Sequence, residues 1–460
     1  MKTELSYYDI YPKVTVDGEP AEITIKPLGS HVKFRGSEYR VAVWPLYKRD
    51  LAYSSLPTVS SCYNVKPGDD GALRFTHTFH EEQEHLVMIY SGESRIASLP
   101  VFSVGKDLKG RYPFIGDLHV HSCYSDGRED PAIVAANLRK CGYDFSVISD
   151  HYRYYPSLKA IDAYKNIKHD FLIVPGEEIH LPSNPFHIVN FGSKYSVNGI
   201  ISDGTQAKEV GTGAEFRSME NENENEDKEI KCPDVMTSAE FTEKMLESSK
   251  TLNLPEGFPR YQIAVCKWIC DHIRRGGGLA IFPHPNWIDF TFHVPETVTD
   301  YLLASGIFDA FEVLGGERYF EQNGFQTSHY YDALSKGIRV PVVGSSDSHG
   351  TINNINFDIA KTIVFSPENK AEALVDSIKN YYSVAVDNLS KEYRLVGEYR
   401  FVKYGSFLIE NFFPLHDELC FEEGRLMKDY ITGENAKEAA ASLGALYGRT
   451  GRQKNKYFAF

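Results

Sequence analysis

Four short strings of the sequence place histidine and aspartate side chains at the ends of apolar runs. They are Asp-Leu-His-Val-His at 117–121, Ser-Asp-His at 149–151, Phe-Pro-His-Pro at 282–285 and Ser-Ser-Asp-Ser-His at 345–349. Residues two apart on a strand point to the same side and lie about 6.6 Å apart along it, so His119 and His121 can grip one cation. Imidazole together with carboxylate suits zinc, manganese or iron rather than calcium. The strings therefore predict a multinuclear metal site.

Two carboxylates beside these histidines have an alternative interpretation. Asp126 lies in a Ser-Asp-Gly turn just after His121, where such a side chain often bonds to its own backbone. Beside so many histidines we interpret it as a ligand. Asp150 either orients a ligand from outside the metal shell or caps the turn that follows it.

The elements that must position these residues are seven apolar runs, each followed by a helix-like segment. The runs are at 112–115, 143–148, 171–174, 187–191, 279–282, 308–313 and 340–343. This alternation predicts a parallel sheet, and ligands at the C-terminal ends of many strands favour a closed β/α barrel with its site at that face. The helix after the first run is expected to begin at Pro131, capped by Asp130, and to end before Gly142.

The spaced set of motifs resembles the PHP superfamily, the metallohydrolases related to histidinol phosphatase and to polymerase-associated phosphoesterase domains. The resemblance covers roughly residues 110–390 and implies an α/β fold, a distorted (β/α)7 TIM-like barrel that holds two or three divalent ions. It carries over to nine positions of this chain, all filled by competent ligands: His119, His121, Asp126, His151, Glu178, His187, His284, Asp347 and His349.

The resemblance also implies how the nine positions share the ions. The three sets are His119, His121, Glu178 and Asp347; Glu178, His187 and His284; and Asp126, His151 and His349. Through a metal-bound hydroxide, Glu178, Asp347 and His349 would then act in catalysis. Phosphoester hydrolysis is the implied reaction. Members with an added β-rich N-terminal domain look more like hydrolases of carboxyl, carbamate or related esters, and a ligand-binding module without turnover is a further alternative.

Several neighbouring residues stay open. Glu177 and Glu178 are adjacent, so only one of them can face the metals, and the Gly-x-Glu spacing favours Glu178. His180 would be an outer-shell partner or a surface residue. Arg128 and Arg153 follow the motifs and would bind a substrate phosphate or remain solvated. The remaining candidates, which we leave outside the site, are Cys123, Glu312 and Glu317.

Composition divides the rest of the chain. Short alternating runs in residues 1–108 predict an all-β sandwich, in which His77, His80 and His85 are ordinary residues. Residues 109–390 form the barrel with an insertion at about 195–275, and residues 391–460 a C-terminal extension packing on the barrel. The insertion holds helix-like segments at 237–249 and 260–275 and an acidic run at 220–227, which we interpret as a mobile loop. The insertion is either a lid or a surface excursion.

The charge and composition of the whole chain limit what the protein can be expected to bind. A formal charge of -14 over 460 residues opposes binding to a phosphate backbone, so nucleic acid is not expected. Seven scattered cysteines predict no disulfide framework. Without a long apolar stretch, the sequence predicts neither a membrane span nor a secretory signal. We expect a cytoplasmic protein acting on a small-molecule ester with zinc, manganese or iron, and the sandwich offers a surface for a homo-oligomer.

Overall fold

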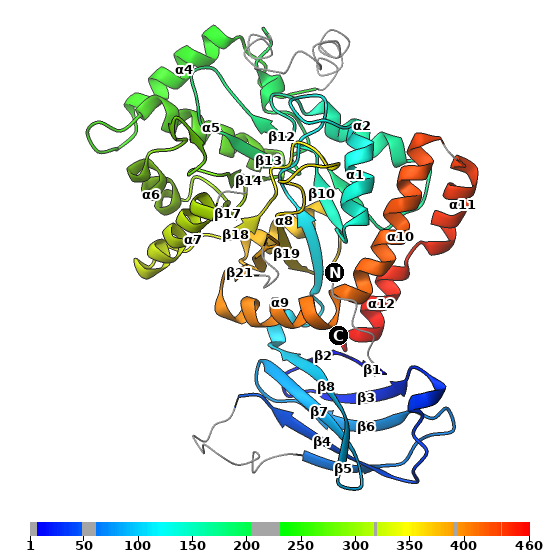
Figure 1. The fold of residues 1–460 in the computed structure, drawn as a ribbon. Coiled ribbons are helices and arrows are strands. Elements are labelled where there is room, and N and C mark those ends of the chain that lie inside the picture. The colour runs from blue at the N-terminus through cyan, green and yellow to red at the C-terminus, as the bar shows by residue number, and fades with distance from the viewer. Residues whose placement is uncertain (1–6, 48–60, 204–230, 317–319, 390–393, 434) are drawn as a thin grey trace. The chain divides into compact units, whose positions relative to one another are not determined.

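The computed structural model describes residues 7–47, 61–203, 231–316, 320–389, 394–433 and 435–460. They form a mixed α/β structure with several sheets, which confirms the predicted class, and they fall into two compact units (Figure 1). The smaller unit comprises Met1–Tyr112, Tyr399–Leu419 and Gly448–Phe460, and the larger comprises Pro113–Glu398 and Cys420–Tyr447. Glu317 and the acidic run at 220–227 lie outside the described residues.

Two sheets build the smaller unit. The three-stranded antiparallel sheet has the order β1 (Tyr8–Tyr11), β3 (Pro20–Pro27), β6 (Leu73–Thr78). The five-stranded sheet has the order β2 (Val14–Val16), β8 (Ser94–Val104), β7 (Gln83–Ser91), β4 (Tyr39–Pro45), β5 (Ser61–Val65). Residues at alternate positions of both sheets, such as Ile23, Ile25, Val41 and Val87, are buried in one core. Two sheets packed face to face around shared apolar side chains are the arrangement of a β-sandwich.

The C-terminal residues are divided between the two units, unlike the single barrel-packing extension predicted for 391–460. Helix α9 (Tyr399–Asn411) belongs to the smaller unit, where the ring of Tyr404 stacks on Phe102 of β8 with centroids 5.1 Å apart. Helix α12 (Arg449–Tyr457) also belongs to the smaller unit, and the Lys13 backbone N–H donates to the Tyr457 carbonyl at 2.7 Å. Apolar and backbone contacts between distant segments such as these leave no periodic signal in the sequence.

The larger unit contains two major sheets. One has the order β11 (Leu172–Val174), β10 (Phe145–Val147), β9 (Tyr112–Asp117), β19 (Ala360–Ser366), β20 (Ser383–Asp387), β21 (Leu395–Val396). The other has the order β12 (Gly176–Ile179), β13 (Ile188–Phe191), β14 (Leu279–Phe282), β17 (Ala310–Leu314), β18 (Val342–Gly344). The run at 171–179 thus supplies two strands, β11 and β12, to different sheets.

The strands are not all parallel, so the predicted parallel sheet is wrong in part. β9, β10 and β11 pair in parallel, as do β14, β17 and β18, but β13 is antiparallel to both of its neighbours. Residues 180–187, which connect β12 to β13, are too few for the crossover that parallel strands require. Because β13 runs in the opposite direction, its first residues lie at the same edge as the last residues of the strands beside it.

Two isolated parallel bridges join the two sheets at this edge. His151, just after β10, bridges to Glu178 of β12, and Val120, just after β9, bridges to Ser348 after β18. Backbone hydrogen bonds reinforce both junctions, including the Tyr152 N–H to the Glu178 carbonyl at 3.0 Å and the His121 N–H to the Ser348 carbonyl at 2.9 Å. The segments that follow the strands are therefore fixed to one another as well as to their own strands.

Helices surround these sheets. They are α1 (Pro131–Lys140), α2 (Tyr155–Tyr164), α4 (Ser238–Lys250), α5 (Arg260–Arg275), α6 (Glu296–Ser305), α7 (Phe320–Ser335), α8 (Ala371–Lys379), α10 (Phe413–Thr432) and α11 (Ala436–Leu446). The predicted start of α1 is confirmed, because the Asp130 carboxylate accepts a hydrogen bond from the Ala132 N–H and Pro131 is the first helical residue. Figure 1 shows α5, α6 and α7 along the outer side of β14, β17 and β18.

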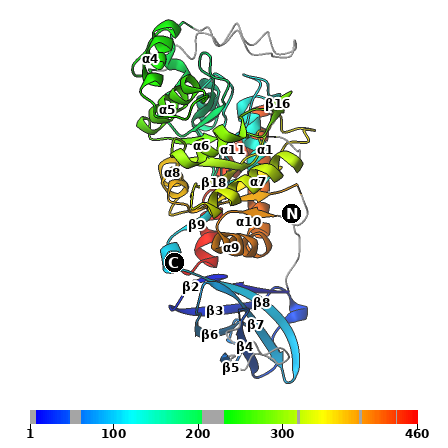
Figure 2. The ribbon, with the colours of Figure 1, turned by 90° about the vertical axis from the view of Figure 1, so that its left-hand side faces the viewer.

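The described part of the insertion packs into the larger unit. Helix α5 buries Ile263, Cys266 and Ile269 in the same core as β14 and β17. Helix α4 lies beside it, as Figure 2 shows, with the ring of Phe241 5.0 Å from that of Trp268. Both helices therefore contribute apolar side chains to the core of the larger unit.

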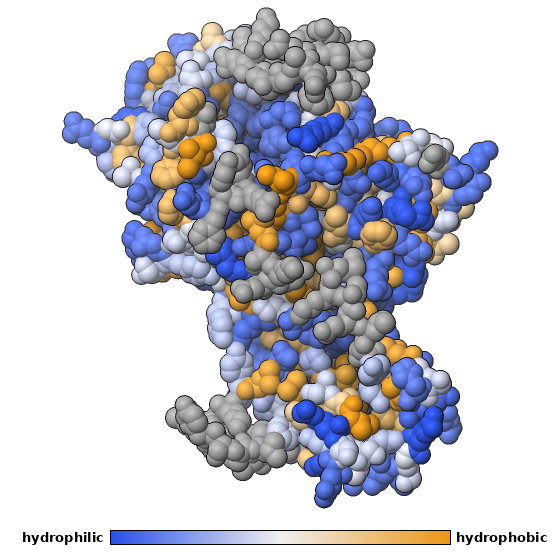
Figure 3. Space-filling model, in the orientation of Figure 1, coloured by the Kyte–Doolittle hydropathy of each residue, from blue (hydrophilic) through white to orange (hydrophobic). Residues whose placement is uncertain are grey.

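No helix among the described residues is both long and apolar enough to cross a bilayer. The face seen in Figure 3 shows hydrophobic residues in small separate groups on a mostly hydrophilic surface, which is normal for a globular protein.

Candidate metal centre

His119 and His121 lie in the segment that directly follows β9. Both side chains are fully buried, and their Nε2 atoms are 3.2 Å apart. The Asp117 carboxylate holds this segment by accepting hydrogen bonds from the backbone N–H groups of His119 and Ser346 at 3.2 and 3.0 Å. The two imidazoles therefore converge just past the end of the strand rather than on it.

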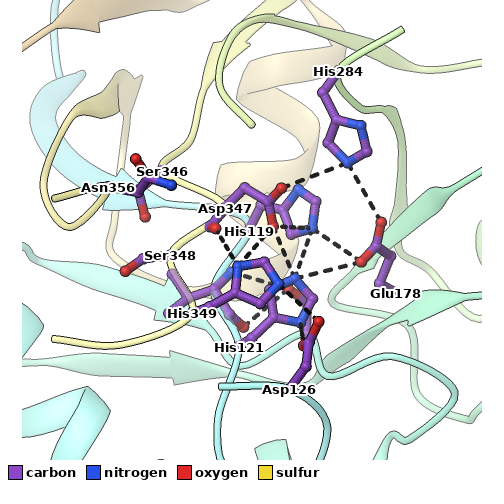
Figure 4. A network of polar contacts seen from close by, with 12 residues as sticks. His119, His121, Asp126, Glu178, His284, Ser346, Asp347, Ser348, His349 and Asn356 are labelled. Atoms are coloured by element: carbon purple, nitrogen blue, oxygen red, sulfur yellow. Dashed lines mark hydrogen bonds and ion pairs between the residues drawn. The ribbon is translucent and has the colours of Figure 1, made fainter. Parts of the chain in front are cut away.

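Glu178, on β12, lies between two groups of histidines (Figure 4). Its Oε2 lies 3.3 Å from the His119 Nε2 and 3.4 Å from the His121 Nε2. Its Oε1 lies 2.8 Å from the His187 Nδ1 and 3.6 Å from the His284 Nε2. His187 reaches this point because it stands immediately before the antiparallel strand β13. One carboxylate thus offers an oxygen to each of two imidazole pairs.

Asp347 completes this buried part of the site. Its Oδ1 lies 3.3 Å from the His119 Nε2 and 2.9 Å from the His121 Nε2, and its Oδ2 lies 3.7 Å from the His284 Nε2. Asp347 and His284 adopt positive φ angles of 48° and 24°. Such backbone conformations cost of the order of 1–3 kcal/mol each and persist where the surrounding structure holds them. We define the deep group as His119, His121, Glu178, His187, His284 and Asp347.

A second set of donors is more exposed to solvent. The Asp126 Oδ2 lies 3.5 Å from the His151 Nε2 and 3.2 Å from the His349 Nε2. The side chains of Asp126 and His349 are 35% and 34% exposed, whereas that of Glu178 is 0% exposed. We define the rim group as Asp126, His151 and His349. Two contacts join it to the deep group: the His151 Nδ1 lies 2.8 Å from the Glu178 Oε2, and the His121 Nδ1 lies 3.8 Å from the Asp126 Oδ1.

All nine predicted ligand positions come together in these two groups. Their donor atoms form clusters that could each hold a metal ion, among them Glu178 with His187 and His284, and His121 with the rim group. These clusters have the composition of the second and third ligand sets that the PHP resemblance implies, with His121 added to the third. Ion binding by these residues stays a prediction.

Glu312 is a site residue that sequence reasoning excluded. It lies on β17, is fully buried, and its Oε2 is 3.1 Å from the His119 Nδ1. A carboxylate on the second ring nitrogen fixes the orientation of an imidazole and leaves the Nε2 lone pair for a cation. The available signal was a single acidic residue within an apolar run, which does not identify its partner.

The structure shows that Glu178, and not Glu177, faces the histidines. The Glu177 carboxylate points away from the histidines and accepts hydrogen bonds from the Ser196 hydroxyl at 2.7 Å and the Val197 N–H at 2.6 Å. Burial raises the pKa of Glu177 to about 7. Asp150 is likewise not a donor to the clusters, because its carboxylate accepts hydrogen bonds from the backbone and hydroxyl of Ser122. It positions the segment after β9.

Two further histidines adjoin the predicted set. The His180 Nε2 lies 2.8 Å from the His151 Nδ1. The His293 Nε2 accepts a hydrogen bond from the His187 backbone N–H at 3.3 Å, and their rings are 4.3 Å apart. The spacing of His180 from Glu178 gave a signal for the first, whereas no motif pointed to His293.

The predicted substrate-binding arginines have different positions. Arg128 is exposed, and its aliphatic stem lies beside Gly350, next to His349 of the rim group. Arg153 is partly buried, and its backbone N–H donates to the Asp150 carbonyl at 3.3 Å. Among the described residues, neither guanidinium forms a hydrogen bond or ion pair with the donor atoms, so their role stays a prediction.

Other candidate groups have the environments of structural residues. Burial and the nearby Asp150 raise the pKa of the Cys123 thiol to about 11, which disfavours a thiolate nucleophile. In the smaller unit, burial lowers the pKa values of His77 and His85 to about 4. The His77 Nδ1 lies 2.8 Å from the Tyr63 hydroxyl, as expected for a histidine packed in a sandwich.

Mutual electrostatics keep the carboxylates of both groups ionised. Burial alone would raise the pKa of Glu178, but the imidazoles of His151, His187 and His119 hold it well below its usual range. Asp126 behaves likewise, since His151 and His349 lower its pKa against the effect of burial. Burial would lower the pKa of His349, but Asp126 and then Asp347 raise it to about 9. Negative charge is therefore available for cations at both levels.

The unsatisfied atoms of the deep group fit divalent cations. Both oxygens of Glu178 and the Nδ1 atoms of His187 and His284 are buried without a hydrogen-bond partner among the described residues. An ionised carboxylate in this state carries a desolvation cost that needs a compensating charge. Distances of 3.3 to 3.6 Å between Glu178 and the Nε2 atoms of His119, His121 and His284 suit two ligands of one ion with bonds of about 2.1 Å. The contact from the Glu178 Oε1 to the His187 Nδ1 is shorter, at 2.8 Å. The residues present therefore fit a metal centre.

Comparison with known proteins gave structural neighbours only. No protein-family model and no curated protein matched the sequence. A two-domain protein from Bacteroides vulgatus that contains a predicted PHP-like metal-dependent phosphoesterase matches over 60% of this chain and 65% of its own, at 15% identity and a TM-score of 0.37. The match thus spans less than two thirds of that protein. Solved PHP-like phosphoesterases are among the structures this chain resembles.

Two shorter neighbours are covered more completely. A protein from Bifidobacterium adolescentis named as a metal-dependent phosphoesterase matches over 51% of this chain and 88% of its own, at 16% identity and a TM-score of 0.32. An amidohydrolase from Chromobacterium violaceum matches over 52% and 89%, at 19% identity and a TM-score of 0.28. Superpositions of this quality do not decide function, which depends on the donor groups themselves.

Proposed function

We propose that this protein is a metal-dependent hydrolase that acts on a small phosphate ester. The observation that carries the proposal is Glu178, a fully buried carboxylate with one oxygen toward His119 and His121 and the other toward His187 and His284. A carboxylate shared in this way suits two neighbouring cations, which is the arrangement of many two-metal hydrolytic sites. Divalent zinc, manganese or iron is the cofactor we propose.

We further propose that the two sheets of the larger unit act as one distorted seven-stranded barrel. The order β9, β10, β12, β13, β14, β17, β18 returns to β9 if the bridges from His151 to Glu178 and from Val120 to Ser348 are counted as strand neighbours. Both bridges lie at the edge where the deep and rim groups gather. In β/α barrels the C-terminal edge carries the active site, which supports catalysis by these groups.

The proposed reaction requires cations in both groups. The protein residues hold these cations and bind the substrate. Bound divalent ions lower the pKa of water and neutralise charge that develops on an ester. Glu178 and Asp347 supply the negative charge that holds ions in the buried part. Of the three residues with a proposed catalytic role, Glu178, Asp347 and His349, the last is the most exposed to solvent. We therefore propose that substrate enters on the side of His349. Arg128, beside Gly350, would there meet the phosphate oxygens, with Arg153 as a second cation.

A carboxyl, carbamate or amide ester is the alternative substrate. The β-sandwich unit favours it, because some PHP-like proteins with an added β-rich N-terminal domain look more like hydrolases of that class. The same donor groups serve either reaction, since a polarised ester carbonyl and a phosphoryl group both develop negative charge on oxygen. A ligand-binding module without turnover is the remaining alternative.

Elemental analysis combined with two release assays tests these alternatives. The purified protein is reconstituted with manganese or zinc and incubated with an aryl phosphate and with an aryl carboxyl ester. Two or three ions per chain with phosphate release support the phosphoesterase, and cleavage of the carboxyl ester alone supports the alternative. Bound ions without any turnover indicate a binding module, whereas fewer than one ion per chain refutes the metal centre.

A further inference from the structure

His151 faces two different sets of atoms with its two ring nitrogens. Its Nε2 lies 3.5 Å from the Asp126 Oδ2 in the rim group. Its Nδ1 lies 2.8 Å from the His180 Nε2 and 2.8 Å from the Glu178 Oε2. A neutral imidazole has one N–H and one lone pair, so the position of its hydrogen decides which set His151 joins as a ligand.

The distances separate a hydrogen bond from a shared ion. Two nitrogens bound to one tetrahedral cation with bonds of about 2.1 Å lie about 3.4 Å apart. The 2.8 Å between His151 and His180 is shorter and matches an N–H···N hydrogen bond. Within the rim group, Asp126 lies 3.5 Å from His151 and 3.2 Å from His349, distances that suit ligands of one cation. His151, Glu178 and His180 also form a group that could hold an ion, but the hydrogen bond between His151 and His180 favours His180 as an outer partner of His151 and the rim group as the ion-binding side.

Two neighbours could accept the His151 Nδ1–H, namely His180 and Glu178. The Glu178 Oε2 is equally close, but the geometry makes no hydrogen bond, and both Glu178 oxygens are without such a partner among the described residues. The His180 Nε2, in contrast, meets the criteria for a hydrogen bond with His151. With His180 as acceptor, Glu178 keeps its oxygens for the deep group.

The His180 ring is itself held in place. It stacks on the ring of Tyr152, with centroids 4.5 Å apart and an angle of 28° between the planes. The His180 backbone N–H donates to the Asn198 side-chain oxygen at 3.2 Å. Tyr152 has a φ of 63°, a left-handed conformation that is rare for an aromatic residue and needs support from its surroundings. Tyr152, the strained residue next to His151, thus packs against the ring of His180, which in turn orients His151.

We propose that His180 is a positioning residue that accepts the His151 Nδ1–H, directs the His151 Nε2 lone pair toward Asp126 and His349, and so sets the affinity of the rim group for a divalent cation. This inference rests on the proposed metal centre and adds a control element to it. Partners that orient a ligating histidine change metal affinity by about 10- to 100-fold when they are removed. His180 lies outside the nine ligand positions and touches the rim group through His151, and its ring also lies 4.3 Å from that of His187 in the deep group.

Two substitutions isolate the hydrogen bond. His180→Phe keeps an aromatic ring for Tyr152 but removes the acceptor, whereas His180→Gln supplies an acceptor oxygen. His272→Phe is the matched control, because His272 packs its ring on Trp268 of α5 at 4.0 Å, apart from the donor groups. Each metal-free protein is titrated with Mn²⁺ by calorimetry, bound metal is counted by elemental analysis, and the thermal unfolding midpoint reports folding.

In wild type and His272→Phe we expect three ions, one of them weaker. His180→Phe is expected to weaken only that ion, by about 10- to 100-fold, and His180→Gln to restore most of its affinity. The inference is overturned if wild type binds no ion at the rim, if His180→Phe binds all ions as wild type does, if it weakens all ions equally, or if His180→Gln behaves like His180→Phe. Three ions without ester hydrolysis would refute the proposed function while leaving this inference intact.

Discussion

The deep group and the rim group use the same residue types in different surroundings. Glu178 and His119 of the deep group are 0% exposed, whereas Asp126 and His349 of the rim group are 35% and 34% exposed. In the deep group a second carboxylate, Glu312, supports His119. In the rim group the partner of His151 is a neutral ring, His180. The His119 imidazole therefore has the support of a charge, whereas the His151 imidazole, 13% exposed, has the weaker support of a dipole.

This difference predicts that the two groups hold their ions with different stability. A buried carboxylate without hydrogen bonds is stable only with a cation beside it, so ion binding in the deep group is coupled to the stability of the larger unit. The rim donors keep part of their hydration, and an ion there competes with water and protons. We therefore expect the deep ions to be permanent and the rim ion to respond to conditions.

The largest expected effect follows from Asp347→Asn. Asp347 contacts His119, His121 and His284, and its loss removes charge from the centre of the deep group. Activity should fall on the order of 10³-fold or more, and bound metal should fall with it. Initial rates on the active ester and elemental analysis measure both. His119→Ala should behave in the same way, and full turnover in either variant would contradict the assignment of the deep group.

A smaller loss is expected from His349→Gln in the rim group. This variant should keep the deep ions and lose the rim ion, with activity reduced on the order of 100-fold. Metal counts distinguish it from Asp347→Asn, because one ion rather than all ions should be missing. If His349→Gln also empties the deep group, the two groups are one cooperative site and the comparison fails.

Glu312→Gln tests the charge support of the deep group. Glutamine keeps the size of the side chain and an acceptor oxygen for the His119 Nδ1–H, but it removes the negative charge. We expect the affinity of the deep ions to fall roughly 10- to 100-fold, while the rim ion is unaffected. Competition with a chelator of known affinity measures this change. Unchanged deep ions would mean that Glu312 acts through its hydrogen bond alone.

The sequence identified the donor residues of the two groups better than the residues that orient those donors, such as Glu312. Helix α5 begins and ends at the expected residues, Arg260 and Arg275, because its apolar face is periodic. Most of the predicted ligands come together because they follow apolar runs, whereas His187 joins them because it precedes the antiparallel strand β13. Glu312 was missed because its partner, His119, is far away in the chain and a lone glutamate in a strand has no periodic signal. Spacing likewise favoured Glu178, but only the structure shows Glu177 turned away toward Ser196 and Val197.

The pH dependence of rim-ion binding sharpens the comparison further. Because the pKa of His349 is raised to about 9, this imidazole is protonated below that pH in the metal-free protein. Burial would lower the pKa of His151, but Glu178 and then Asp126 raise it as well. A cation must therefore displace protons from both rings, so rim affinity should rise by more than about tenfold per pH unit between pH 7 and 9. In metal-free protein the His349 proton stabilises the fold at low pH, and its contribution is lost as pH rises through about 9. Chelator competition at several pH values should show one proton fewer released by His349→Gln.

The smallest effect is expected from Cys123→Ala, in the segment that joins the two groups. Cys123 is buried, and its backbone N–H donates to the Glu129 carbonyl at 2.9 Å, a bond that alanine retains. With a pKa of about 11, less than about one thiol in 10³ is ionised at pH 7.5, so the side chain has no role as a nucleophile. Metal content and turnover should stay near the wild-type values. A loss of turnover with all ions still bound would instead place the chemistry on this segment, and the deep and rim groups would then serve only to bind.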